Sequence, residues 1–136
     1  MRDRRRRLGA TERGAAVVEF AILLPIFLLI IGGIVDAGRM FFRQIELANA
    51  AREGARYAVV DTSASTGAIQ SRAQASAPGL TMTTSVALCS GAGTDATVTA
   101  TANFQWFVLG VAMNLVGGSN TLPTTISSTA VMRCDS

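Results

Sequence analysis

The chain has 136 residues, enough for one modest domain and too few for a separate domain that carries an active site. Hydrophobic residues make up 49% of it and charged residues only 15%, which excludes a disordered tail and directs attention to a membrane segment. The chain has no histidine and two cysteines, so zinc sites built on His and Cys and His-based catalytic devices are excluded.

The first 14 residues form a basic leader. They hold six arginines against Asp3 and Glu12, about +4, whereas the other six arginines face seven acidic residues, about −1. A basic arm that binds nucleic acid is one interpretation, but arginines directly before an apolar run more often set the orientation of a membrane segment. We therefore expect a cytoplasmic leader, residues 1–14, and no nucleic-acid partner.

An apolar run follows at residues 15–35. As a helix it measures about 31 Å at about 1.5 Å per residue, close to the hydrocarbon thickness of a bilayer. The arginines before it predict a single-pass protein of the bacterial cytoplasmic membrane, with a cytoplasmic amino terminus and the bulk of the chain outside. A cleaved signal peptide is the alternative, because Val35-Asp36-Ala37 loosely resembles a cleavage site, but the run exceeds the usual length of about 7–15 residues.

Glu19 is the one charged residue inside this run. An ionisable group costs about 2.5–3.5 kcal/mol at the centre of a bilayer, so it calls for a reason. One interpretation is that Glu19 lies one turn into the membrane and reaches back to the surface. The other starts from a cut after Gly14, which would give Ala15 a free ammonium group with which a Glu19 carboxylate, its own or a neighbour's, can pair.

The stretch ERGAAVVEF, residues 12–20, resembles the cleavage region of prepilin-like proteins of the tight adherence (Tad, or Flp) type IV pilus systems. In these proteins a glycine, four residues and a Glu-Phe or Glu-Tyr pair mark processing by a prepilin peptidase. The wider run over residues 12–60 resembles the TadE-like pseudopilin family. Its most specific matches are Asp36, Gly38, Arg39 and the segment 49–58, and the matched block spans about a third of the chain.

The resemblance implies a function in pilus assembly. It implies a TadE-like minor pilin or pseudopilin that takes part in assembling a Tad/Flp pilus for adhesion and surface attachment, with processing between Gly14 and Ala15 and subunit docking through Glu19 and Phe20. The implied partners are other pilins, the Tad assembly platform in the membrane, the prepilin peptidase and the lipid bilayer. We expect no enzyme activity, no cofactor, no metal site and no small-molecule substrate.

The helical pattern continues outside the membrane over residues 36–60. The spanning helix can therefore run for about 46 residues, roughly 69 Å. Apolar residues of this part recur at spacings of three and four on one face: Phe41, Ile45, Ala48, Ala51, Ala55 and Ala58. We expect the carboxyl-terminal half of this face to pack on the chain's own domain, and its small side chains also suit packing of neighbouring subunits. Pro25 predicts a kink.

Residues 61–136 read as a small extracytoplasmic domain. A turn at 61–66 ends the long helix, a short helix is expected at 67–77, and strands are expected at 81–88, 96–107 and 122–133. Phe104 and Trp106 share the inward register of the second strand and are expected in the core, not in a ligand platform. The fold class is α+β: a pilin-like long amino-terminal helix packed on a small antiparallel sheet.

Cys89 and Cys134 both fall on the extracytoplasmic side, an oxidising location in bacteria. Each follows the end of an expected strand, and the first and third strands of an antiparallel meander point the same way. Both thiols therefore lie at one end of the sheet. We expect one disulfide, which closes a loop of about 46 residues and stabilises the fold by roughly 4 kcal/mol in the chain-entropy model.

Two other functions fit parts of this pattern. One is a membrane-anchored surface-binding protein or adhesin that is not part of a pilus, and the other is a small secreted protein released after Ala37, with Gly38 as its mature terminus. The chain has no Gly-rich phosphate loop, no CxxC pair and no EF-hand spacing. The terminal residue of the mature chain separates these possibilities.

Overall fold

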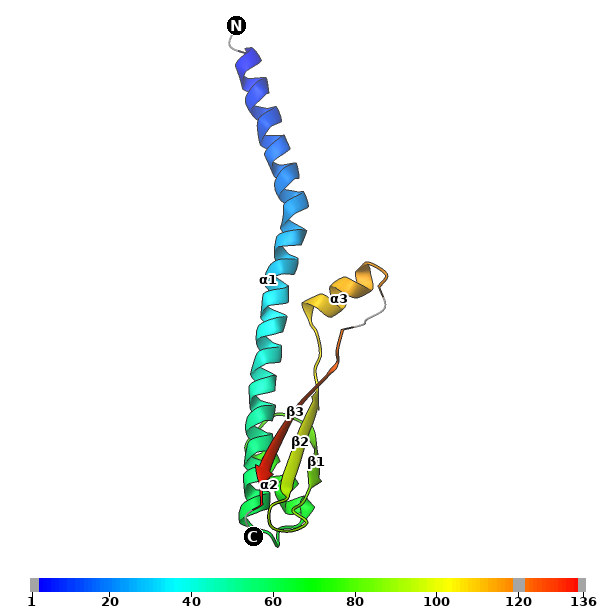
Figure 1. Ribbon diagram of the computed structural model, residues 1–136. Helices are drawn as coiled ribbons and strands as arrows, with labels where there is room; N and C mark the ends of the chain where they lie inside the picture. Colours follow the sequence, from blue (N-terminus) through cyan, green and yellow to red (C-terminus); the bar gives the residue numbers. More distant parts are fainter. Residues whose placement is uncertain (1–2, 119–121, 135–136) are drawn as a thin grey trace.

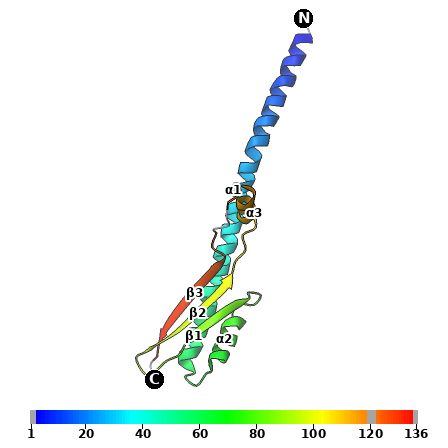
Figure 2. The ribbon, with the colours of Figure 1, turned by 90° about the vertical axis from the view of Figure 1, so that its right-hand side faces the viewer.

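A long helix with a small α/β body at its carboxyl-terminal end forms the molecule (Figures 1 and 2). The structure is a computed structural model, and it describes residues 3–118 and 122–134, with side chains from Gly14 onward. Its elements in chain order are α1 (Asp3–Val60), α2 (Thr66–Ala75), β1 (Met82–Ala87), β2 (Asp95–Asn103), α3 (Val108–Leu115) and β3 (Thr125–Arg133). The expected α+β fold, a long helix on a small antiparallel sheet, is confirmed.

Helix α1 is continuous from the leader to the body. It passes through Pro25 without a break, and Figure 1 shows a gentle bend in its blue part, which contains this proline. The helix ends where expected: the Asp61 carboxylate accepts hydrogen bonds from the backbone N–H and the hydroxyl group of Ser63, at 3.1 Å and 2.7 Å. These local bonds compete with a further helical turn and start the loop to α2.

The three strands form an antiparallel sheet in the order β1-β2-β3, with Val98 opposite Val86 and Ala130. Along β2 buried and partly exposed residues alternate, as the period of a strand with one covered face requires. Val98 and Ala100 point to the covered face, whereas threonines occupy the other, where the hydroxyl groups of Thr99 and Thr129 lie 2.9 Å apart.

Small side chains allow α1 to lie close to the sheet. Gly54 of α1 faces β2 and α2: a Cβ atom added to it would lie 3.1 Å from Val98 Cγ1 and 3.2 Å from the Ala73 side chain. The largest fully buried apolar side chains are Leu47, Ile69 and Val98, which belong to α1, α2 and β2. The core is therefore a thin layer between α1, α2 and one face of the sheet.

The predicted apolar face of α1 divides into two parts. Ala51, Ala55 and Ala58 are buried against the body, which confirms the expectation for the carboxyl-terminal half. Phe41 and Ile45 in the other half are 63% and 58% exposed. Their neighbours Met40 and Gln44 contact the core and Ser127 of β3, so Phe41 and Ile45 lie on a side of α1 that the body leaves largely open.

The second strand is shorter than predicted. It ends at Asn103 instead of residue 107, and the chain then turns into α3, a helix that the sequence did not predict. Phe104 is nonetheless buried at 3% exposure, and its ring meets that of the half-buried Trp106 edge to face, with centroids 5.1 Å apart. The expectation that both aromatic rings pack with the core is confirmed.

The two cysteines form the expected disulfide. Cys89 and Cys134 follow β1 and β3 at the same end of the sheet, with Cα atoms 6.1 Å apart. Cys134 also exchanges backbone hydrogen bonds with the loop before β2, to Gly93 and Thr94, both at 2.8 Å. The bridge thus ties the last strand and both neighbouring loops together.

Removing the bridge should destabilise the body equally from either side. Cys89→Ser and Cys134→Ser should each lower the free energy of unfolding by roughly 4 kcal/mol, because each opens the same loop. The double substitution should cost no more than either single one. Denaturant unfolding of the purified chain measures this, and alkylatable thiols in the exported native protein or additive losses would contradict it.

Candidate functional site

Helix α3 docks on α1 close to the end of the apolar run. A Cβ atom added to Gly32 would lie 2.7 Å from Val108 Cβ, so a glycine is needed for the Val108 side chain to approach α1 here. Gly33, the next residue, has nothing within 4 Å of the corresponding position. The notch at Gly32 therefore fixes where and on which face of α1 the shorter helix lies (Figure 1).

Asp36, one turn further along α1, caps the amino terminus of α3. Its Oδ1 accepts a hydrogen bond from the Phe107 N–H at 3.2 Å, and its Oδ2 accepts from the N–H groups of Val108 and Leu109 at 2.9 Å and 3.1 Å. Phe107 occupies the N-cap position and makes no capping bond of its own. A carboxylate from another helix thus satisfies donors that the first turn of α3 leaves open.

Arg39 completes this cluster. Its Nη1 donates to Asp36 Oδ1 at 3.3 Å and to the Gln105 carbonyl oxygen at 3.4 Å. Its guanidinium group lies 4.1 Å from the ring centroid of Phe107 and 5.4 Å from that of Phe104. The arginine therefore compensates the Asp36 charge and covers the two rings that flank the chain's entry into α3.

Asp36 is the one fully buried polar side chain among the side chains that the structure describes. A buried carboxylate is costly unless it is hydrogen-bonded and paired, and three N–H donors and one guanidinium group meet both conditions. No buried side-chain polar atom in the described part of the chain lacks a partner. The cluster can hold α3 in place, and it offers no reactive group to a substrate.

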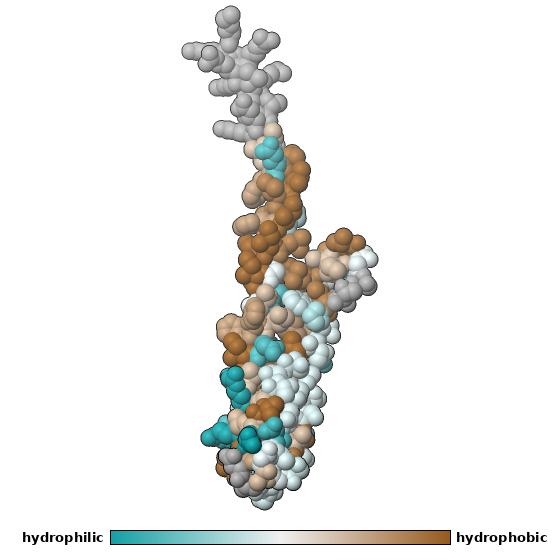
Figure 3. All heavy atoms as spheres, in the orientation of Figure 1, coloured by the Kyte–Doolittle hydropathy of each residue, from teal (hydrophilic) through white to brown (hydrophobic). Residues whose placement is uncertain are grey.

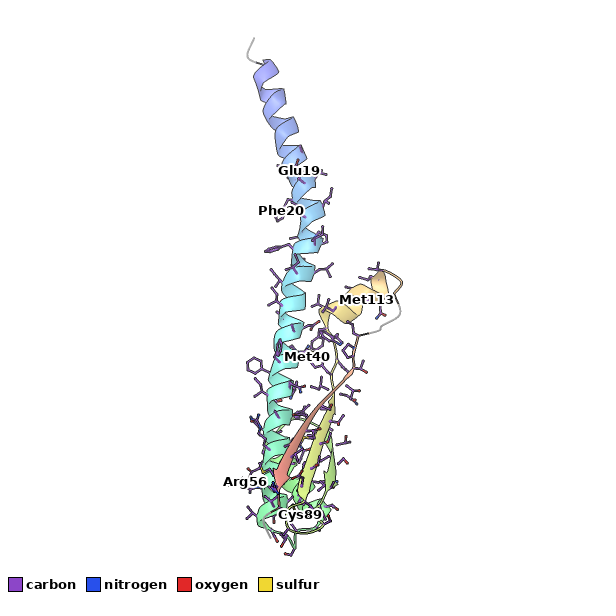
Figure 4. All side chains as sticks on the ribbon, in the orientation of Figure 1. Glu19, Phe20, Met40, Arg56, Cys89 and Met113 are labelled. Atoms are coloured by element: carbon purple, nitrogen blue, oxygen red, sulfur yellow. A yellow bond between two sulfur atoms is a disulfide. The ribbon has the colours of Figure 1, made fainter. Side chains whose placement is uncertain are left out.

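Glu19 and Phe20 of the expected docking site lie on the part of α1 that projects away from the body (Figure 4), and Gly14 and Ala15 precede them on the same helix. Gly14, Ala15, Glu19 and Phe20 are exposed, and the structure does not bring them together with the body. In contrast, Cys89 and Cys134 lie at the far end of the body (Figure 4). The expected sites therefore occupy opposite ends of the molecule.

The projecting part of α1 suits a bilayer. In the described part of the chain, α1 is the one helix that is long and apolar enough to cross a membrane. Its large side chains are exposed along the whole run, as the brown surface in Figure 3 shows. A soluble protein would bury such a surface, so this helix suggests a single-pass membrane anchor.

A second charged cluster lies where α1 meets α2. Glu53 Oε1 is 2.8 Å from Arg72 Nη2, and its Oε2 is 3.4 Å from Arg56 Nε. The hydrogen bond from Arg72 is the main influence that holds the pKa of Glu53 below its usual value, against a smaller opposing effect of burial, and the Arg56 charge adds to it. With Asn49 and Arg52 these residues line an open groove of about 540 Å³.

Comparison with known proteins gives a match to part of the long helix α1. Residues 14–56 match the family model of the TadE-like protein. No curated protein and no solved structure was found to match the chain. The match confirms the resemblance inferred from the sequence, and we call residues 14–56 the TadE-like segment.

The TadE-like segment contains both surfaces by which α1 holds the rest of the chain. Gly32, Asp36 and Arg39 dock α3, and Gly54 lies against β2. Asp36 and Arg39 belong to the residues that carry the resemblance in the sequence, but the sequence does not indicate their structural role. The role became visible only with α3, whose signal in the sequence is the apolar run at 107–116 followed by Gly117.

The described part of the chain contains no group of three or more His, Cys, Asp or Glu residues that could hold a metal ion. The arrangement presents an apolar helix at one end of the molecule and fixes a small body to the other.

Replacing Asp36 should release α3. In Asp36→Ala, three N–H groups lose their acceptor, so the free energy of opening of α3 should fall by about 1–3 kcal/mol. Amide hydrogen exchange of Val108 and Leu109, measured on the full chain in detergent, should then rise about 5- to 150-fold. Glu46→Ala is the matched control, because it removes an exposed pair with Arg43 on the same helix. Unchanged exchange in Asp36→Ala would show that apolar contacts alone hold α3.

Proposed function

We propose that this chain is a TadE-like minor pilin or pseudopilin, a single-pass membrane protein that takes part in assembling a Tad/Flp-type type IV pilus. In this proposal residues 1–14 are a cytoplasmic leader and residues 15–35 span the membrane. Residues 36–60 continue the helix outside, and residues 61–136 form the extracytoplasmic domain. Its partners are other pilins and the assembly platform of the Tad system.

One observation carries the proposal. The TadE-like segment is a single uninterrupted helix that is bare and apolar at one end and packed on a small α/β body at the other. A helix that only anchored the protein would need no more than the membrane-spanning part. In contrast, α1 continues beyond it and packs on the sheet and α2 as part of the body. This shape lets many copies align their apolar ends side by side while the bodies remain outside, which is what assembly from a membrane requires.

The orientation follows from charge. The leader carries six arginines, whereas no Lys or Arg occurs in the chain between Arg13 and Arg39. Positive residues next to a span favour the cytoplasmic side, so the leader stays inside and the disulfide-bonded body lies outside. The Cys89–Cys134 bridge agrees with this orientation, because disulfides persist in oxidising compartments.

Gly14 has the surroundings that a peptidase site needs. It is exposed, and a Cβ atom added to it would meet nothing within 4 Å. Since α1 is continuous across the bond between Gly14 and Ala15, a peptidase must first open the helix there. A glycine lowers that cost by about 1 kcal/mol relative to alanine. We therefore assign the cut of a prepilin peptidase to this bond.

Gly14→Leu should block this cut. Intact-mass measurement on pilus-producing cells should find a chain that begins at Ala15 in the wild type and a full leader in the variant. Gly33→Leu is the matched control, because it also places a leucine on an open face of α1 and should still be cut. An intact leader in the wild type would refute processing, while the TadE-like match would stand.

Glu19 is assigned a role in docking between subunits. It is exposed on α1 among large exposed apolar residues, and Phe20 beside it is 65% exposed. Within lipid a lone carboxylate is costly, and so is the ammonium group that cleavage creates at Ala15. A pair between Glu19 of one copy and Ala15 of the next offsets part of both costs and aligns the copies along their axes.

Substitution of Glu19 should separate insertion from assembly. Glu19→Ala should leave the amount of protein in the membrane unchanged or higher, since a costly group is gone, while pilus yield falls. Glu19→Gln keeps the shape and loses the charge, so it should also lower the yield. Glu46→Ala is the control for an acid on the outer half of α1. Normal pilus yield from both Glu19 variants would contradict the docking role, and Glu19 would then be a charge that the membrane segment merely tolerates.

A further inference from the structure

The outer face of α3 is apolar and uncovered. Phe107, Val111 and Leu115 recur one helical turn apart and are all exposed, Leu115 at 82%, and Val116 continues this surface at 85%. Figure 3 shows brown atoms over α3, beside the apolar stretch of α1. Large apolar residues at this density on one short helix mark an interaction surface.

The surroundings of α3 lack charge. No Asp, Glu, Lys or Arg occurs in the sequence between Asp95 and Arg133, so the strands' outer ends and the whole α3 region are neutral. The nearest ionic groups are Asp36 and Arg39, which are paired with each other. A neutral region of this length is unusual in water and suits a surface next to lipid.

Several backbone groups at both ends of α3 have hydrogen-bond partners within the chain. At the amino terminus Asp36 accepts from three N–H groups. At the carboxyl terminus the Gly117 N–H bonds to the Asn114 carbonyl oxygen at 3.3 Å, and the Gly118 N–H bonds to that of Met113 at 3.1 Å. Gly117 has a φ of +74°, which closes the helix in this way. A helix in lipid needs such internal partners, because no water is present to supply them.

The depth of α3 follows from its contact with α1. Val108 packs on Gly32, which lies inside the apolar run and three residues before its end at Val35, about 4.5 Å along the helix axis. Whatever surrounds this turn of α1 must also surround the helix packed on it. If α1 spans the bilayer, lipid surrounds both.

We propose that α3 is a second membrane-contacting element, which lies in the leaflet on the side of the body with Val111 and Leu115 facing the acyl chains and Phe107, whose ring carries the Arg39 guanidinium group, at the boundary with the headgroups. The proposal rests on the membrane span of α1 and not on pilus assembly. Asp36 and Arg39 then lie at the headgroup level and hold the two membrane elements at a fixed angle. The body is thereby oriented against the membrane surface instead of swinging on a single helix.

Fluorescence quenching by brominated acyl chains tests this directly. The chain has a single tryptophan, so Trp106→Phe provides a silent background for one reporter at a time. The test reporter is Leu115→Trp; Phe27→Trp reports on the span, and Val60→Trp reports on the far end of α1, where Val60 is exposed. Each full-length chain is placed in nanodiscs of phosphatidylcholine whose acyl chains are brominated near their middle. The bromine quenches a tryptophan that contacts lipid. Added acrylamide, which reaches the protein from both sides of the nanodisc, quenches a tryptophan that is exposed to water.

The proposal expects the reporters at 115 and 27 to be quenched by bromine and blue-shifted, and the reporter at 60 to respond only to acrylamide. A reporter at 115 that behaves like the one at 60, while 27 is quenched, would overturn the proposal and leave the span intact. A reporter at 115 that is shielded from acrylamide but not quenched by bromine would also overturn it, since protein then covers α3. If 27 is not quenched either, the span itself fails.

A second measurement avoids the loss of Trp106, whose indole N–H donates to the Pro123 carbonyl oxygen at 2.8 Å. A photo-crosslinking p-benzoylphenylalanine at position 115 of the otherwise unaltered chain should form adducts with phosphatidylcholine. Adducts with a second copy of the chain and none with lipid would overturn the proposal.

Discussion

The carboxylate of Asp36 is the interaction on which the arrangement of this molecule depends. It is buried, it lies directly after the apolar run of α1, and it accepts hydrogen bonds from three backbone N–H groups at the start of α3. Such a group is tolerated only where donors and a countercharge meet it, and Arg39 supplies the countercharge. Without this cluster, the packing of Val108 on Gly32 would be left to hold α3, and the chain between β2 and β3 would lose its fixed position beside α1.

The TadE-like segment performs two tasks with one continuous helix. Its first half is covered with large exposed apolar side chains, as a lipid-facing surface is, and its second half is lined with alanine and glycine, as a closely packed core helix is. Phe41 and Ile45 lie between these halves and remain exposed. In the proposed pilin function they extend the surface along which neighbouring helices pack.

Much of this fold could be predicted from the sequence because its signals are local and periodic. The alternation of Val98, Ala100 and Ala102 marked the sheet face, and the order of two cysteines after two strands led to the disulfide. Helix α3 could not be found in the same way. A short apolar run of eight residues directly after a strand cannot be distinguished by its composition from a continuation of that strand. Its cap comes from Asp36, 71 residues away, and no local pattern contains such a partner. Docking through Glu19 stays a prediction, because the group expected to pair with its carboxylate belongs to another copy of the chain.

The contact between Gly32 and Val108 is the most direct test of this arrangement, because it is the point where the side chain of α3 approaches α1 most closely. In nuclear magnetic resonance spectra of the labelled full chain in nanodiscs, a nuclear Overhauser effect should connect the Gly32 Hα protons with the Val108 methyl groups. Gly33, which faces open space, should show none and serves as the internal control. The first signal is expected without the second. Absence of both signals, with α1 intact, would contradict the docking of α3 on α1.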